Sequence, residues 1–185
     1  MKNIITIFVL LIGLVVNVSA QKYFTKTGNI SFHSDTPMEK IEAVTNSATS
    51  VLDMETGKIQ WAVLVKSFSF EKALMEEHFN ENYMESTKFP KAKFTGSIDN
   101  AGSLNLSKDG KYNVTVTGNL EIHGVTKPVT SSAEFVVKGG KITANSGLKI
   151  LVADYGIDIP SLVKDKIAKE IDIKIQATYE AMAKS

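Results

Sequence analysis

Cysteine and arginine are both absent from this 185-residue chain, and all 21 of its basic residues are lysines. Without cysteine the protein has no disulfide framework, so its stability must come from the packing of a core. Without arginine it lacks the planar forks that dominate the recognition of phosphates and base edges. The net charge is only +1. Together these features argue against nucleic acid as a partner.

Long apolar runs are also scarce. One of them lies near the N-terminus, from Ile4 to Val16, and it is shorter than the roughly 20 residues that a transmembrane helix needs. Lys2 precedes this run, and Val18-Ser19-Ala20 follows it with the small residues that a signal peptidase reads. We therefore expect residues 1–20 to be a signal peptide cleaved near Ala20. Residues 21–185 are then one domain without stable membrane insertion, located in the periplasm or secreted.

The sequence is rich in two-residue alternation of apolar and polar side chains, which is typical of half-buried strands. The clearest cases are Tyr112–Ile122 and Ile171–Tyr179. Weaker versions occur at Ile30–Ser34, Ile41–Leu52, Ala92–Ile98, Val129–Val137 and Ile142–Val152. One face of each strand then meets a core and the other meets water, as in antiparallel sheets.

Turn signals separate these runs. Asp109-Gly110 and Gly139-Gly140 supply the positive φ of tight hairpins, and further signals occur around Gly57, Gly102 and Gly124 with Pro128. A meander of about eight long strands closes most naturally into a barrel, because closure removes the exposed edges. The sequence therefore predicts an all-β fold, an extended antiparallel β-barrel with one or two short helices.

Two segments interrupt the alternation and predict those helices. Apolar and aromatic residues at helical spacing predict a helix over Glu71–Tyr83. A shorter helix is expected over Pro160–Ile167, with the proline near its start. The strand at Ile59–Val65 is apolar on both faces, so we expect the first helix to cover it, outside the barrel or across its mouth.

Catalytic and metal sites have weak signals. His33, His78 and His123 lie far apart, without the local ligand pairs of zinc sites, so no metal is predicted. No nucleophile stands beside a recognisable base, and no cofactor is implied. Carboxylates such as Glu76 and Glu77 are more typical of a solvated helix face than of a general acid–base pair.

Aromatic residues give the strongest functional signal, because they crowd into residues 68–94. As a set beside a barrel mouth they could line an apolar tunnel with polar groups at its tip. The predicted tunnel residues are Phe68, Phe70, Leu74, Phe79, Tyr83, Phe89 and Phe94, with His78 as the polar tip. The alternative for each of these residues is ordinary core packing.

Three segments carry a resemblance to a known family: His78–Ser86, Lys88–Gly96 and Gly118–Val129. They resemble the YceI-like family of exported, lipocalin-like proteins, and the likeness runs from about Ile30 to Tyr179. It implies a lipocalin-like barrel that holds a long apolar molecule, such as a polyisoprenoid or its quinone or phosphate derivative. Many relatives carry an Arg-Asp pair before the histidine where this chain has Met75-Glu76-Glu77, so an arginine-based contact with a pyrophosphate is not expected.

The leading hypothesis is a carrier or sequestering protein, not an enzyme, that encloses an apolar lipid. Burial of a long tail supplies a large binding free energy, because each buried CH₂ contributes about 0.8 kcal/mol. One alternative is a hydrolase or isomerase of the same fold that acts on a lipid-like substrate through His78 and a nearby carboxylate. A third hypothesis is a binding module without a pocket. The sequence is compatible with a homodimer and does not identify the lipid.

Overall fold

The computed structural model describes residues 22–182, so the predicted signal peptide lies outside the described residues. Eight long strands make up most of this part: β1 (Lys22–Asp35), β2 (Lys40–Asp53), β3 (Lys58–Leu64), β5 (Lys91–Asp99), β6 (Gly110–Ile122), β7 (Val125–Lys138), β8 (Lys141–Leu151) and β9 (Glu170–Ala181). The other elements are short: η1 (Val65–Ser67), β4 (Ser69–Phe70), α1 (Ala73–His78), η2 (Phe79–Tyr83), η3 (Ala101–Ser103) and η4 (Val152–Tyr155).

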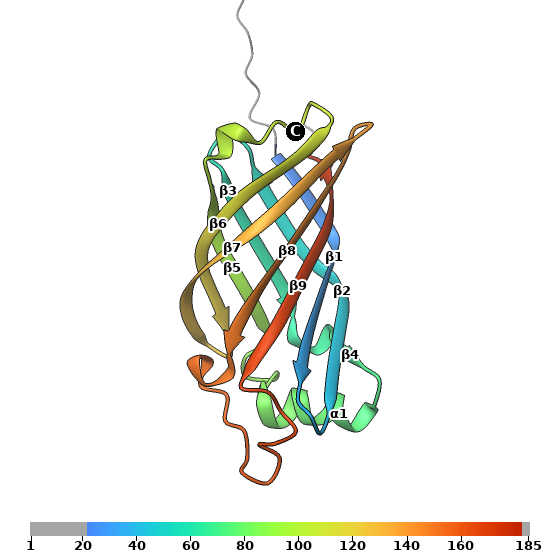
Figure 1. Ribbon diagram of the computed structural model, residues 1–185, viewed down its shortest axis with the longest axis vertical. Coiled ribbons are helices and arrows are strands. Elements are labelled where there is room, and N and C mark those ends of the chain that lie inside the picture. Colours follow the sequence, from blue (N-terminus) through green and yellow to red (C-terminus); the bar gives the residue numbers. More distant parts are fainter. Residues whose placement is uncertain (1–21, 183–185) are drawn as a thin grey trace, which may run out of the picture.

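The long strands form a closed antiparallel barrel (Figure 1). Each pairs with the next long strand along the chain, and β9 pairs with β1 to complete the circle. The two-residue β4 pairs with β2 through Ala43 and Phe70. The predicted all-β antiparallel barrel is therefore confirmed, with eight strands in the closed circle and one short helix.

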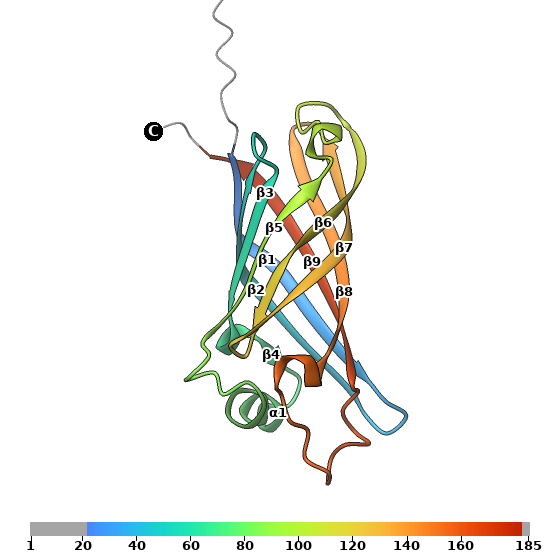
Figure 2. The same cartoon turned by 90° about the vertical axis from the view of Figure 1, so that its left-hand side faces the viewer.

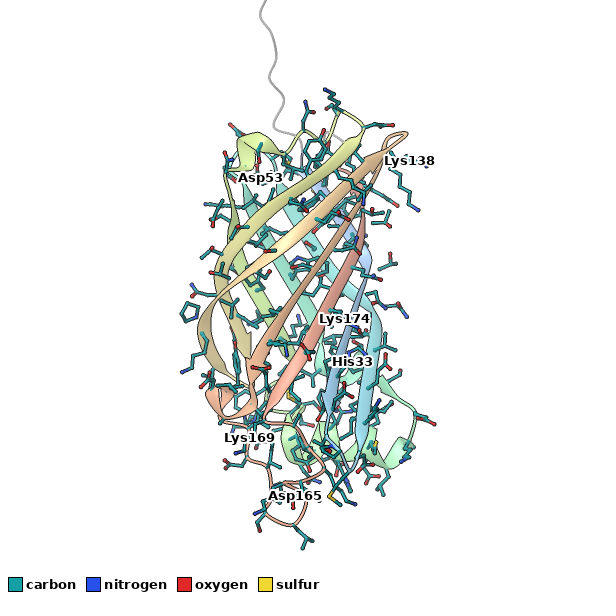
Figure 3. The ribbon with its side chains drawn as sticks, viewed as in Figure 1. His33, Asp53, Lys138, Asp165, Lys169 and Lys174 are labelled. Carbon is teal, nitrogen blue, oxygen red and sulfur yellow. The ribbon has the colours of Figure 1, made fainter. Side chains whose placement is uncertain are left out.

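The barrel has two different ends. At one end, called here the closed end, lie the β2–β3 and β7–β8 hairpins, marked by Asp53 and Lys138 in Figure 3. At the other end, called the mouth end, lie α1, the β1–β2 turn and the long β8–β9 connection that contains Asp165 (Figures 2 and 3). The segment between β3 and β5, residues 65–90, crosses the mouth end and carries α1 there. We call this segment the excursion.

A buried core fills the closed half of the barrel. Alternate residues of every strand point inward, and at this end they are large enough to meet one another. This core contains Tyr23, Leu52, Ile59, Ile98, Leu104, Leu106, Val114, Val116, Ala133, Phe135, Val137, Ile142, Ala144, Ala177 and Tyr179. Leu104 and Leu106 come from the β5–β6 connection, and their buried side chains cover the core at that end.

The two predicted helices had different outcomes. The helix expected over Glu71–Tyr83 is present as α1 and the π-helical turn η2, and it begins at Ala73 because Lys72 is extended. The helix expected over Pro160–Ile167 is wrong, since this stretch forms successive turns. Leu162 in its middle is 93% exposed. Short helices depend on tertiary packing for their stability, and here the apolar side chain has no surface to pack against.

Candidate functional site

The mouth half of the barrel is hollow. It contains a cavity of about 580 Å³, within the usual range for small-molecule sites. Its wall is mainly aliphatic and aromatic and draws on every long strand: Ile30, Phe32, Ile41, Trp61, Val63, Phe94, Leu120, Val129, Leu148, Ile150, Ile173 and Ile175, with Phe68, Phe70 and Phe79 from the excursion. A molecule enclosed here would exchange water for apolar side chains over most of its length.

The floor of the cavity is the surface of the closed-half core that faces the mouth end. Trp61 packs edge-on against Tyr179 with ring centroids 6.4 Å apart, and Phe135 stacks on the same tyrosine at 6.2 Å. The Tyr179 hydroxyl lies 2.7 Å from the Ser50 hydroxyl. Burial raises the pKa of Tyr179, so this hydroxyl stays protonated and the floor carries no charge.

An aromatic cluster walls the cavity beside the mouth. Phe79 lies at its centre, with ring centroids 5.3 Å from Phe32, 5.0 Å from Phe70 and 6.1 Å from Phe68. Because Phe79 follows α1 directly and Phe32 belongs to β1, these contacts hold the helical segment across the end of the barrel. Phe32 was missed from the sequence, although its inward position in the β1 alternation was a usable signal.

The structure brings together most of the predicted site residues. Six of the seven predicted tunnel residues line the cavity, as does the predicted polar tip: Phe68, Phe70, Leu74, Phe79, Tyr83, Phe94 and His78. Leu74 is 61% exposed, so it lies at the rim rather than in the middle of the cavity. Burial raises the pKa of the Tyr83 hydroxyl, which therefore remains a hydrogen-bond donor at neutral pH.

Phe89 is the exception and does not line the cavity. Its ring packs edge-on against the His123 ring, with centroids 4.6 Å apart, and the Lys88 ammonium lies 4.8 Å from its centroid. A side chain on Gly124 would come within 2.5 Å of the same ring. Phe89 thus fastens the segment before β5 to the β6–β7 turn, and its assignment to the tunnel is corrected to a packing role.

A glycine pair shapes the wall beside Phe94. Gly96 of β5 and Gly118 of β6 are register partners. A Cβ on either would come within 2.6 Å of the Phe94 ring. The absence of side chains at these two positions leaves room for the Phe94 ring against the two strands.

Charged and polar side chains gather at the rim of the cavity. Lys72, Lys166, Glu39 and His78 all contribute to its lining. The Lys72 ammonium lies 3.7 Å from the Glu39 carboxylate, so part of this charge is neutralised. The charged side chain that lines the cavity elsewhere in the described chain is Lys93 of β5, so a polar end of a ligand would meet most of these charges at the rim.

The acid–base pair needed by the enzymatic alternative is not assembled. Among residues 22–182 the histidine–carboxylate pairs are His33–Glu42 and His123–Glu85, and His78 belongs to neither. The Glu76 carboxylate instead accepts a hydrogen bond from the Phe70 backbone N–H at 3.3 Å.

Metal-ligating groups do not converge in the described chain, where no three His, Asp or Glu side chains are arranged to hold an ion. His33 lies on the outer wall (Figure 3). The expectation that no metal is bound stays a prediction. Over residues 22–182, no helix combines the length and apolarity of a membrane span.

A closed antiparallel barrel with one filled half and one hollow, apolar half defines a lipocalin-like architecture. The YceI-like domain matches residues 20–179 of the sequence. The chain therefore belongs to the YceI-like family, which confirms the resemblance drawn from its motifs.

Curated relatives share about 30% or less of the aligned residues with this chain, and they are longer than it. A UPF0312 protein of Pseudomonas putida strain W619 is 27% identical over 133 residues, which cover 68% of this chain and 65% of the relative. A UPF0312 protein of Shewanella denitrificans is 31% identical over 84 residues, covering 45% and 40%. The alignment thus spans just under two thirds of the length of the Pseudomonas relative.

Solved structures share the fold at low identity. A polyisoprenoid binding domain from Saccharophagus degradans superposes with a TM-score of 0.76 at 18% identity, covering 89% of this chain and 100% of that domain. BcnA of Burkholderia cenocepacia superposes with a TM-score of 0.68 at 20% identity, covering 83% and 96%. At these identities the likeness establishes the architecture.

Proposed function

We propose that this protein is a carrier or sequestering protein that encloses the apolar chain of a polyisoprenoid or isoprenoid-quinone-like lipid in the mouth half of its barrel. The observation that carries the proposal is the cavity of about 580 Å³, which is walled by aliphatic and aromatic side chains and reaches the rim at one end. The printed description of the Saccharophagus degradans domain as polyisoprenoid binding supports the same ligand class.

The apolar wall is sufficient to bind such a molecule without an arginine clamp. At about 0.8 kcal/mol per buried CH₂, several isoprene units supply enough free energy to offset the loss of translational and rotational freedom. Selectivity among lipids then comes from the girth of the cavity at Phe32, Phe79 and Phe94. The polar end of the lipid lies at the rim, near Lys72 and Lys166.

Export is part of the proposal. A water-filled compartment with lipids on either side is where a protein that shields an apolar chain is useful, and the pattern of residues 1–20 supports secretion or a periplasmic location. The intact mass of the protein recovered from the cell envelope decides this part. A mature species that retains residues 1–20 would contradict it.

The single tryptophan of the chain makes the binding test direct. Trp61 lines the cavity, so its fluorescence should change when an apolar molecule enters. We expect saturable titration with geranylgeraniol, a C₂₀ isoprenoid alcohol, and a stoichiometric lipid in an organic extract of the purified protein. An unchanged Trp61 signal together with a lipid-free extract would rule out the carrier function.

The same substitution at two alanines distinguishes a ligand cavity from a packed core. Ala92 lines the cavity, whereas Ala177 is buried in the closed-half core. Ala92→Phe should abolish uptake of geranylgeraniol with little loss of stability. Ala177→Phe should retain uptake and overpack the core, at a cost of about 1–3 kcal/mol. If Ala92→Phe bound the alcohol normally, the cavity would not be its site.

A further inference from the structure

The barrel wall is split between β7 and β8. These strands pair from Ala133–Lys138 to Ser146–Lys141, whereas the ladders on both sides continue: β7 stays paired with β6 to Val125, and β8 stays paired with β9 to Leu151. Residues 125–132 and 147–151, all within the described chain, therefore face each other without pairing. Figures 1 and 2 show β7 bowing away from β8 below this point. We call this gap the side window.

Serine side chains form hydrogen bonds at the upper edge of the window, where the β7–β8 ladder ends. The Ser146 hydroxyl donates to the Ser132 carbonyl at 2.9 Å. The Ser131 hydroxyl lies 2.9 Å from the Ser146 hydroxyl, and it must be the donor because the Ser146 proton is already used. A side-chain hydroxyl thus satisfies a backbone carbonyl where the ladder stops. The β7–β8 ladder therefore ends at specific serine hydrogen bonds and does not fray.

The lower edge is also closed. The η4 segment lies below the diverging strands (Figure 2) and ties back to the β6–β7 turn. There the His123 Nδ1 atom lies 3.2 Å from the Tyr155 carbonyl oxygen. Tyr155 is 2% exposed. The opening is therefore a framed window and not the loose end of a sheet.

The sequence of β7 protects its open edge. Lys127 occupies an inward-facing position between Val125 and Val129, yet it is exposed. Pro128, next to it, has no N–H to offer a partner strand. Inward-pointing charges and prolines are devices that natural edge strands use against pairing. The unpaired edge is thus encoded in the chain and belongs to the folded state.

The window opens into the cavity. Cavity-lining residues stand on both of its sides, Val129 and Ser131 on β7 and Leu148 and Ile150 on β8. We propose that the side window is a lateral portal through which the apolar chain of a lipid enters and leaves the cavity. This inference rests on the proposed carrier function. Through the window a long chain can move in sideways, whereas at the mouth it must thread end-on past Phe70 and Phe79.

The test bridges the window in a chain with no native cysteine. If the β7–β8 register continued, Thr130 would face Lys149, and both side chains are exposed. The double variant Thr130→Cys/Lys149→Cys is treated with a reducible bis-maleimide. The matched control is Lys138→Cys/Lys141→Cys, an exposed pair already in register within the intact ladder. Uptake of geranylgeraniol is followed by stopped-flow fluorescence of Trp61, and release by transfer to phosphatidylcholine vesicles.

Bridging the window should slow both uptake and release about tenfold, which corresponds to about 1.4 kcal/mol of added barrier, and reduction of the reagent should restore both rates in the same sample. The bridged control should keep the wild-type rates. Thr130→Trp, which adds a large ring at an exposed position on the edge of the window without cysteine chemistry, should slow uptake in the same direction. Saturation should not change in any of these proteins.

Unchanged rates in the bridged protein and in Thr130→Trp would overturn the portal while leaving the carrier function intact. Failure of the wild-type protein to bind geranylgeraniol at all would instead count against the carrier function. Saturable binding thus tests the carrier function, and the rates of uptake and release test the portal.

Discussion

The hydroxyl groups of Tyr179 and Ser50 lie 2.7 Å apart in the floor of the cavity. Tyr179 is 3% and Ser50 2% exposed. Their hydrogen bond joins β9 to β2, the two strands that pair with β1, at the level where the filled half meets the hollow half. Because Tyr179 also contacts Phe135 and Trp61, this bond fixes the position of the floor.

Tyr179→Phe should destabilise the protein, since the buried Ser50 hydroxyl loses its partner. An unsatisfied buried hydroxyl costs about 1–3 kcal/mol, measured as a lower midpoint in urea unfolding. The double variant Tyr179→Phe/Ser50→Ala removes both polar groups and should recover part of the loss. A double variant less stable than the sum of the two single changes would show that the bond is not the cause.

Stability should fall in alkaline solution. Burial raises the pKa of Tyr179 above the 10.0 that is usual for tyrosine, and burial acts in the same direction on the pKa values of Tyr23, Tyr83 and Tyr155. Above about pH 10 the unfolded chain loses these protons while the folded chain keeps them, so the free energy of unfolding decreases as the pH rises. Below that pH the contribution is fully present.

Urea midpoints measured between about pH 8 and about pH 11 check this alkaline loss. Tyr179→Phe should flatten the curve, because it removes the phenol whose pKa is raised furthest. A midpoint that stays constant over the whole range in the wild-type protein would contradict the prediction.

The glycine pair gives a third prediction. A Cβ on Gly118 would lie 2.5 Å from the Gly96 Cα and 2.6 Å from the Phe94 ring, so backbone and ring must both move. Gly118→Ala should therefore lower the stability by about 1–3 kcal/mol. Gly102, with nothing within 4 Å of its Cβ position, is the matched control. Gly118→Ala with a thermal midpoint equal to that of Gly102→Ala would refute the steric argument.

The barrel could be predicted from sequence because its signals are local. The alternation over Tyr112–Ile122 and Ile171–Tyr179 gives both the strand and its inward face. The hollow half could not be predicted in this way. Phe32 and Val137 both occupy inward positions, yet Phe32 faces the cavity and Val137 is buried in the core, because this depends on which residues of distant strands meet them.

The wrong predictions for Phe89 and Pro128 also arose because local sequence does not show contacts with distant strands. Phe89 shares the aromatic character of its neighbours, but the β6–β7 turn, more than thirty positions away, supplies the surface on which it packs. Pro128 was interpreted as part of a turn signal with Gly124, and it lies inside β7. A proline within a strand indicates an unpaired edge, so the side window had a signal in the sequence that the turn interpretation concealed.

The last prediction concerns His123, which bridges three segments of the mouth end. Its Nε2 atom lies 2.9 Å from the Glu85 carboxylate, and its Nδ1 atom lies 3.2 Å from the Tyr155 carbonyl oxygen. The backbone of His123 has a φ of 52°, a conformation that is strained for residues other than glycine. The side-chain contacts therefore hold a backbone conformation that has an intrinsic cost.

Replacing His123 in two ways separates the contacts from the strain. Both variants lose the hydrogen bonds, which should lower the stability by about 1–3 kcal/mol. His123→Gly relieves the positive φ and His123→Ala does not, so the order of urea midpoints should be wild type, then glycine, then alanine. Lys88→Ala removes the exposed 3.8 Å ion pair to Glu85 and should change little. An alanine variant as stable as the glycine variant would mean that the turn relaxes its conformation once the imidazole is gone.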